Sequence, residues 1–167
     1  DNIRKLRSYI AKLVDPFGTT KSVNVVTYFV GSSPKDCGLN GPIGNNIADV
    51  LREKTSRIKV SIEGSKVVSQ LVDRGRQIYK ISEPNPYPEL ERCKVEGEVF
   101  FLNRRAKATF GHRMKVTSVE FGSVFLFLNG FRIFPIGEET DDTLGLNRRK
   151  QQGQARYLGT RDVLGRI

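Results

Sequence analysis

The chain has 167 residues, a net charge of +10, two cysteines and one histidine. This length allows one domain with its own hydrophobic core, whereas so few cysteines and histidines argue against an ordinary metal site or a disulfide framework. No apolar run approaches the ~20 residues of a membrane span and no signal peptide is visible, so we expect no membrane segment. Two cysteines without a disulfide framework fit a reducing cytoplasm.

The positive charge is concentrated in two segments. Residues 101–116 carry five basic residues and no acidic one, and residues 147–167 carry six basic residues against Asp162. The rest of the chain is balanced. Two focused patches favour an anionic partner, namely a nucleotide, a nucleic acid or an acidic protein. The alternative is a set of solvated loops and helix faces that bind nothing.

The first 46 residues predict a helix, a strand and a loop. Apolar residues from Ile3 to Val14 share one helical face, and Asp15-Pro16 ends that helix. Residues 22–30 are rich in β-branched and aromatic side chains and predict a strand. The glycines between Gly31 and Gly44 suggest a phosphate cradle, but the G-x-x-x-x-G-K-[ST] signature is missing, so we interpret this segment as a loop.

The middle of the chain predicts a helix followed by a β-meander. Residues 45–54 fit a short helix, with Ile47, Val50 and Leu51 facing inward. Strands are predicted over residues 57–62, 67–73 and 77–81, with turns at Glu63-Gly64 and Arg74-Gly75. Residues 83–89 contain three prolines and predict a surface connection.

The next segment alternates strands with a basic helix. Residues 93–102 predict a half-buried strand with Val95, Val99 and Phe101 on its apolar side. Asn103 is a good N-cap for a helix up to Met114, and residues 119–128 predict a central strand buried on both faces. Asn129-Gly130 favours a type I′ hairpin turn into a strand over residues 131–136. Together these elements predict an α+β sheet with helices on one side.

The C-terminal stretch holds the candidate site. We expect the acidic loop Gly137–Asp142 to be solvated rather than to bind metal. Asn147 can cap a short helix in which Arg148 and Gln152 lie one turn apart, and Gly153 would end it. Arginine supplies a bidentate phosphate fork and glutamine adds an uncharged amide donor. One histidine and no G-x-S-x-G motif make nucleophilic or acid–base catalysis a poor case.

The stretch FGSVFLFLNGFRIFPIGEE…LGLNRRKQQGQARYLGTRDVLGRI resembles the end of the transducer domain of GHKL ATPases. This family includes the gyrase B subunit, MutL, MORC proteins and the heat-shock chaperone Hsp-ninety, and the chain is most similar to bacterial Hsp-ninety-like members. The opening IRKLRSYIAKLVDPF is similar to the helix that leaves their nucleotide-binding domain. The chaperone's L-x-L-x-R-x-x-x-Q loop is matched by Leu144, Leu146, Arg148 and Gln152.

The resemblance implies both a fold and a role. The fold would be a ribosomal-protein-like two-layer sheet-and-helix domain with a left-handed βαβ crossover, in which the 103–114 helix is the crossover helix. Residues 1–18 would be a linker helix leaving an N-terminal ATP-binding domain absent from this chain, and residues 19–167 the transducer domain of a longer protein. That absent domain would be the partner and would hold ATP and Mg²⁺, so no cofactor or activity is expected of this part alone.

The resemblance also assigns roles to individual residues. Arg148 and Gln152 would contact the ATP γ-phosphate as catalytic residues, with cofactor-binding positions at Arg149, Lys150, Gln151 and Gly153. The gyrase form of the loop, Gln-Thr-Lys, is missing, and Arg149 and Lys150 replace less basic residues of the chaperone loop. Which of the cations at positions 148–150 binds phosphate therefore stays open.

The residues themselves also support a rival function, a basic nucleic-acid-binding module. The 103–115 helix and the 148–166 loop would then follow the phosphate backbone of DNA or RNA. Few exposed aromatics lie among the cations, which argues against base stacking. A passive dimerisation or scaffold domain is the third interpretation. The candidate anion contacts are Arg104, Arg105, Lys107, Arg113, Arg156 and Arg161.

Overall fold

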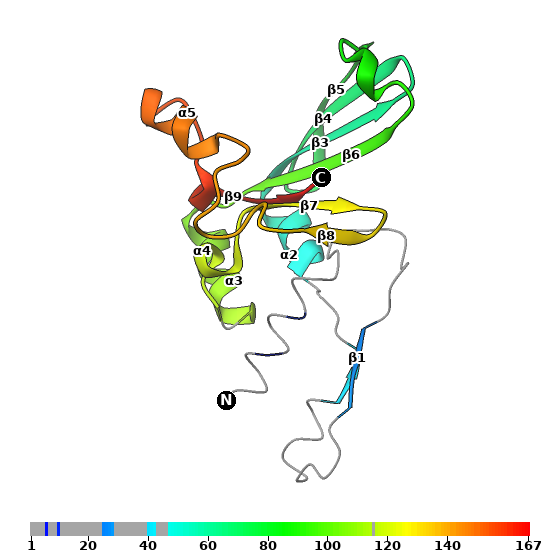
Figure 1. The fold of residues 1–167 in the computed structure, drawn as a ribbon. Coiled ribbons are helices and arrows are strands. Elements are labelled where there is room, and N and C mark those ends of the chain that lie inside the picture. The colour runs from blue at the N-terminus through cyan, green and yellow to red at the C-terminus, as the bar shows by residue number, and fades with distance from the viewer. Residues whose placement is uncertain (1–5, 7–9, 11–24, 29–39, 43–46, 115) are drawn as a thin grey trace.

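The computed structural model describes residues 6, 10, 25–28, 40–42, 47–114 and 116–167, with the backbone alone for 47–50. Within these residues the fold is α+β, as predicted: one seven-stranded mixed sheet accompanied by α-helices (Figure 1). None of the helices in these ranges has the length and apolar character needed to cross a membrane.

The elements follow one another closely along the chain. Before the main sheet, β1 (Val26–Thr27) pairs with β2 (Gly41–Pro42). The remaining elements are α2 (Ile47–Lys54), β3 (Ser56–Glu63), β4 (Lys66–Asp73), β5 (Arg76–Pro84), η2 (Pro88–Leu90), β6 (Lys94–Phe101), α3 (Arg104–Met114), α4 (Ser118–Phe121), β7 (Val124–Leu128), β8 (Phe131–Ile133), α5 (Leu146–Gln152), η3 (Thr160–Asp162) and β9 (Val163–Arg166).

Much of the predicted N-terminal organisation lies outside the described residues. Of the helix predicted over 3–14, only Leu6 and Ile10 are described, and both are helical. Of the strand predicted over 22–30, β1 is described, and most of the glycine-rich loop over 31–44 is not. Cys37 also falls outside the described ranges, whereas Cys93 is an exposed free thiol.

The predicted meander β3–β4–β5 is confirmed. Adjacent strands pair antiparallel along almost their whole length. Arg74 and Gly75 both have positive φ, 45° and 82°, as a type I′ turn requires. The same geometry closes the predicted β7–β8 hairpin, where Asn129 and Gly130 have φ of 51° and 85°. Both turns were visible in the sequence because each contains a glycine, which adopts positive φ without steric cost.

The C-terminal strand β9 lies inside the sheet, between β6 and β7, in the order β5-β4-β3-β6-β9-β7-β8. It pairs antiparallel with β6 and parallel with β7. The strands that α3 and α4 connect, β6 and β7, therefore run in opposite directions. The left-handed βαβ crossover predicted around the 103–114 helix is not confirmed, since α3 does not join two parallel strands.

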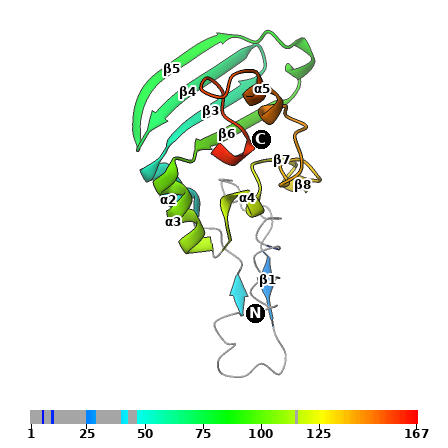
Figure 2. The same cartoon turned by 90° about the vertical axis from the view of Figure 1, so that its left-hand side faces the viewer.

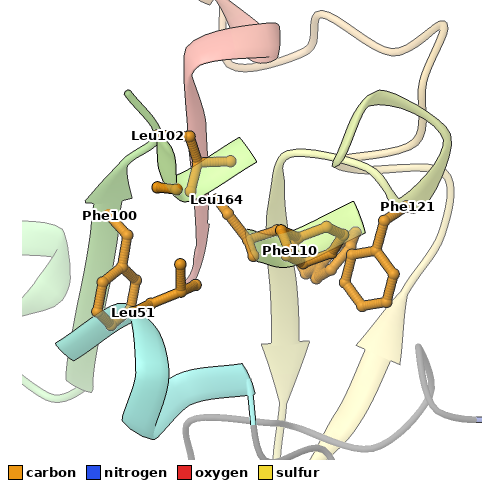
Figure 3. Packing of buried hydrophobic residues seen from close by; sticks show 8 residues of the cluster. Leu51, Phe100, Leu102, Phe110, Phe121 and Leu164 are labelled. Atoms are coloured by element: carbon orange, nitrogen blue, oxygen red, sulfur yellow. The ribbon is translucent and has the colours of Figure 1, made fainter. Parts of the chain in front are cut away.

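The hydrophobic core lies where the helices α2, α3 and α4 meet the strands β6, β7 and β9. Figure 3 shows Leu51 of α2 beside Phe100 of β6 and Phe110 of α3 beside Phe121 of α4, and Leu164 of β9 belongs to the same cluster. Phe110 and Phe121 pack edge to face with ring centroids 5.2 Å apart, a geometry that contributes about 1 kcal/mol beyond burial. The predicted cap of α3 is confirmed, because Asn103 Oδ1 accepts a hydrogen bond from Ala106 N at 2.9 Å.

A buried carboxylate ties α2 to the sheet. Glu98 of β6 is 6% exposed and lies 3.3 Å from Nη2 of Arg52 and 2.9 Å from Nη1 of Arg57. The two guanidiniums compensate a charge that would otherwise be costly to bury. The buried side of β6, which carries Glu98, is not the side that the sequence predicted to be apolar. Phe100 is fully buried and Phe101 is 38% exposed, the reverse of the expected alternation, because the face that carries Glu98 and Phe100 meets the helices.

The strand predicted over 119–128 begins later than expected. Residues 118–121 form the single turn α4, which starts with a capping box: Thr117 Oγ1 accepts from Glu120 N, and the Glu120 carboxylate accepts from Thr117 N. The sequence T-S-V-E carries this signature, and it overrides the apolar pattern that favoured a strand. Leu128, at the tip of the hairpin, is 63% exposed rather than buried.

Gly165 sets how closely β9 approaches β6. A Cβ at this position would lie 2.3 Å from the Glu98 carbonyl oxygen and 2.8 Å from the Val99 Cα. We predict that Gly165→Ala lowers the free energy of unfolding by about 2 kcal/mol or more, because the backbone of a central strand must move to admit the methyl group. Urea denaturation measures this effect.

The matched control is Gly97→Ala in the neighbouring strand, where a Cβ would find its nearest atom at 3.8 Å. This variant should change stability by less than about 0.5 kcal/mol. Equal effects at the two glycines would contradict the close approach.

Candidate phosphate-binding arm

Residues 134–159 form an arm, which we call the α5 arm, that leaves the sheet after β8 and returns through η3 to β9. It starts at the cis Phe134-Pro135 peptide and carries α5, none of whose residues is buried. Figure 1 shows α5 standing apart from the strands of the sheet, and Figure 2 shows the arm from its outer side. The arm therefore presents side chains outward from a fixed attachment.

Arg132 anchors the start of the arm. Its guanidinium is sandwiched between the rings of Phe125 and Phe134, at 4.0 and 4.3 Å from their centroids, and pairs with Glu138. Burial lowers the pKa of Arg132, and the opposite charge of Glu138 works against that shift. A buried cation held by two rings and a carboxylate fixes where the acidic loop begins.

The acidic loop folds upon itself and caps α5. Asp141 accepts hydrogen bonds from Thr143 Oγ1 and Gly137 N, which lower its pKa. Asp142 accepts from Asn147 N at 2.8 Å and Arg148 N at 3.0 Å, the otherwise unpaired amides of the first helical turn. The predicted Asn147 cap is wrong, because Gly145 occupies the N-cap with φ 67° and Asp142 supplies the capping oxygens.

Two contacts tether α5 to the rest of the domain. Asn147 Oδ1 accepts from the backbone N and the Oγ1 of Thr160, at 3.0 and 3.1 Å. Asp162 accepts from Lys150 of α5 and, at 3.1 Å, from Lys107 of α3. The two basic segments of the sequence therefore meet at one carboxylate. Lys150, predicted to bind the cofactor, has its ammonium engaged inside the domain.

The charge of Asp162 is strongly stabilised. Partial burial alone would raise its pKa, but hydrogen bonds from Lys150, from Gly159 N and from Lys107 lower it to about 2. The carboxylate is thus ionised at any physiological pH and holds both ammonium groups.

The remaining predicted phosphate contacts on α5 are accessible to solvent. Arg148 and Gln152 are exposed, lie one turn apart and make no side-chain hydrogen bond or ion pair within the described residues. Arg149 and Gln151 are also exposed, and Gly153 ends the helix as predicted, its N–H donating to Lys150 O at 3.1 Å. Of the three cations at positions 148–150, Arg148 and Arg149 are the ones left outward-facing.

The structure separates the other predicted anion contacts. Arg156 and Arg161 are exposed near α5, and Arg104 and Arg113 are exposed on α3. We call the contact of Asp162 with Lys107 and Lys150 the Asp162 junction. Arg105 and Lys107 lie on opposite flanks of the buried stripe of α3, so Arg105 faces away from this junction. The junction itself was not predicted. Its only signal in the sequence was a single acid among six basic residues.

Among the described residues, no group of three or more histidine, cysteine or acidic side chains is arranged to hold a metal ion. No protein-family model matches the chain, and no curated protein or solved structure shows significant similarity to it. The function proposed below therefore rests on the geometry of the α5 arm and on the resemblance of its sequence.

Asp162 gives a pH-dependent contribution to stability. Because its folded-state pKa of about 2 lies below the ordinary 3.8, the ionised form stabilises the fold above pH 4, and this contribution is lost as pH falls from 4 to 2. We predict that Asp162→Asn lowers the free energy of unfolding by about 1–2 kcal/mol at pH 7. Chemical denaturation across this pH range should show the difference from wild type shrinking toward pH 2.

Glu139→Gln is the control, since Glu139 is exposed on the same arm. It should be neutral at pH 7. A constant difference between Asp162→Asn and wild type from pH 7 to pH 2 would show that the ionised carboxylate is not what matters.

Proposed function

We propose that the chain is the transducer domain of a bacterial GHKL-type ATPase, which offers a γ-phosphate-sensing helix to a separate ATP-binding domain. The observation that carries this proposal is the exposure and spacing of Arg148 and Gln152. They are exposed, one turn apart, on an arm braced by Asp142 and Asp162, and neither side chain is used within the described domain.

The chemistry of these two side chains fits a terminal phosphate. A guanidinium donates two parallel hydrogen bonds to phosphate oxygens and brings a permanent positive charge. An amide one turn away adds a donor without adding charge. Charge accumulates on the phosphoryl oxygens during transfer, so a positioned arginine stabilises the transition state more than the ground state.

The contacts that hold α5 give a route by which loss of the γ-phosphate changes the position of the whole domain. Asp142 holds the first turn of α5, and Lys150 and Asn147 tie the helix to η3, which continues into the central strand β9. When the γ-phosphate is released, the contacts of Arg148 and Gln152 are lost, and the domain is free to change its position relative to the nucleotide. This is the order–disorder type of switch, in a protein that we expect to act in the cytoplasm.

Arg148→Ala tests the proposal in the protein that joins this chain to its ATP-binding domain. We predict a fall in turnover of about 10²–10³-fold with a small change in ATP affinity, because the guanidinium acts mainly on the transition state. Gln152→Ala should have a smaller effect in the same direction. Steady-state ATPase kinetics separate the two parameters.

Arg92→Ala serves as the matched control, since Arg92 is an exposed arginine in the connection between β5 and β6. Its turnover should equal that of wild type. Wild-type turnover in the Arg148 variant would remove the assignment.

A nucleic-acid-binding function is the second candidate, and the Asp162 junction favours it. Asp162 binds both Lys107 and Lys150 and so connects α3 with α5, and Arg104 and Arg149 are exposed on these two helices. A polyanion could span the two segments. Such a function is compatible with an ATPase that works on DNA.

A gel-shift titration of this chain with a duplex DNA and a single-stranded RNA tests this candidate. If about six phosphates are contacted, affinity should fall by about 10³-fold between 50 and 200 mM salt. Arg104→Glu and Arg149→Glu should each weaken binding, whereas Arg92→Glu should not. Absence of binding at 50 mM salt, or binding that does not depend on salt, would eliminate this function.

A further inference from the structure

A cavity of about 440 Å³ opens between α2 and α3, a size typical of small-molecule sites. These two helices pack side by side under the end of the sheet (Figure 2). The end of α2, the first two turns of α3, and the ends of β3, β4 and β6 line the cavity. It is separate from the α5 arm, none of whose residues contributes to its wall.

Polar and charged side chains make up much of this pocket's wall, and one part of the wall is apolar and contains an accessible ring. Leu51, Ala106 and Phe110 line it and are each at most 4% exposed, so they form a rigid floor that belongs to the core. Phe101 also lines it but is 38% exposed, although it sits at the end of a central strand. An exposed ring beside a packed apolar floor suits the flat apolar body of a ligand.

The charged groups at the rim leave two cations available. Asp73 is occupied, because it accepts from Ser56 Oγ at 2.7 Å and from Arg74 Nε at 3.2 Å. Lys54 and Arg105 line the pocket and form no ion pair within the described residues. Glu53 is the remaining acid of the rim, so the unpaired groups leave an excess of one positive charge.

The position of Arg105 on α3 separates this pocket from the Asp162 junction. Arg105 and Thr109, one turn apart, line the pocket, whereas Lys107 reaches Asp162 on the opposite flank. The basic residues of α3, which are adjacent in the sequence, thus face two different places: the pocket and the Asp162 junction. Arg105 can bind an anion in the pocket without involving any residue that braces α5.

We propose that this pocket binds a small amphipathic anion, whose aromatic or apolar body packs against Phe101 and whose anionic group binds Arg105 and Lys54. The anionic group is a carboxylate, sulfonate or phosphate, all of which accept charge-assisted hydrogen bonds from these two cations. The site goes beyond the proposed ATPase role and does not depend on it.

Fluorescence titration of the whole chain with 8-anilinonaphthalene-1-sulfonate, an aromatic sulfonate, tests this site. Arg105→Gln and Phe101→Leu should each weaken binding about tenfold, the loss expected for one charge-assisted hydrogen bond or one ring contact. Arg104→Gln is the matched control, because Arg104 is the neighbouring exposed arginine and does not line the pocket. Arg148→Ala should also leave the affinity unchanged, which separates this site from the proposed phosphate sensor.

Equal affinities in the Arg105, Phe101 and Arg104 variants would overturn the proposal, as would absence of saturable binding to wild type. Urea denaturation of each variant shows that the fold is retained, and Arg105→Gln, an exposed substitution, keeps the test valid if Phe101→Leu unfolds. Displacement of the dye by AMP would assign a phosphate-bearing ligand, and displacement by indole-3-acetate a carboxylate-bearing one. Displacement by neither at millimolar concentration would count against the site.

Discussion

The carboxylate of Asp162 holds the arrangement on which the proposed function depends. It binds Lys107 of α3 and Lys150 of α5 at once, and it lies in η3, one residue before the central strand β9. A single ionised group thus connects the sheet, the core-packing helix and the outward-facing helix. Because its pKa is about 2, the connection persists across the physiological pH range. Without it, α5 would keep its cap at Asp142 and its contact between Asn147 and Thr160 but would lose its connection to α3.

Because of this connection, the cations of the C-terminal segment have different roles. Lys150 is neutralised internally, whereas Arg148 and Arg149 stay outside, and the acidic loop serves as a brace in which Asp142 caps α5 and Glu138 pairs with Arg132. On α3, Lys107 belongs to the same brace and Arg105 to the pocket beside α2. Net charge alone would have assigned all of these residues to one binding surface. The contacts show that each of these two helices carries both a lysine engaged within the domain and exposed arginines.

The sequence predicted those features whose cause is local. The meander and the Asn129-Gly130 hairpin followed from turn residues, α3 from its cap at Asn103, and the exposed Arg148–Gln152 pair from helical spacing.

Features decided by distant partners were missed. The apolar side of β6 was misassigned because Glu98 is buried against Arg52 and Arg57, which no local pattern reveals. The Asn147 cap failed because Asp142 competes from outside the helix, and the T-S-V-E capping box before β7 was a local signal that the apolar run obscured. Strand order was equally out of reach, since β9 takes its place between β6 and β7 through pairings distant in the chain.

In the proposed function, α5 reports the presence of a terminal phosphate to the rest of the domain. Amide hydrogen exchange over residues 146–152, in a protein that joins this chain to the proposed ATP-binding domain, is the decisive measurement. We expect slower exchange with a non-hydrolysable ATP analogue than with ADP, and no such difference in Arg148→Ala. Identical exchange of these amides with the two nucleotides in the wild-type protein would contradict it.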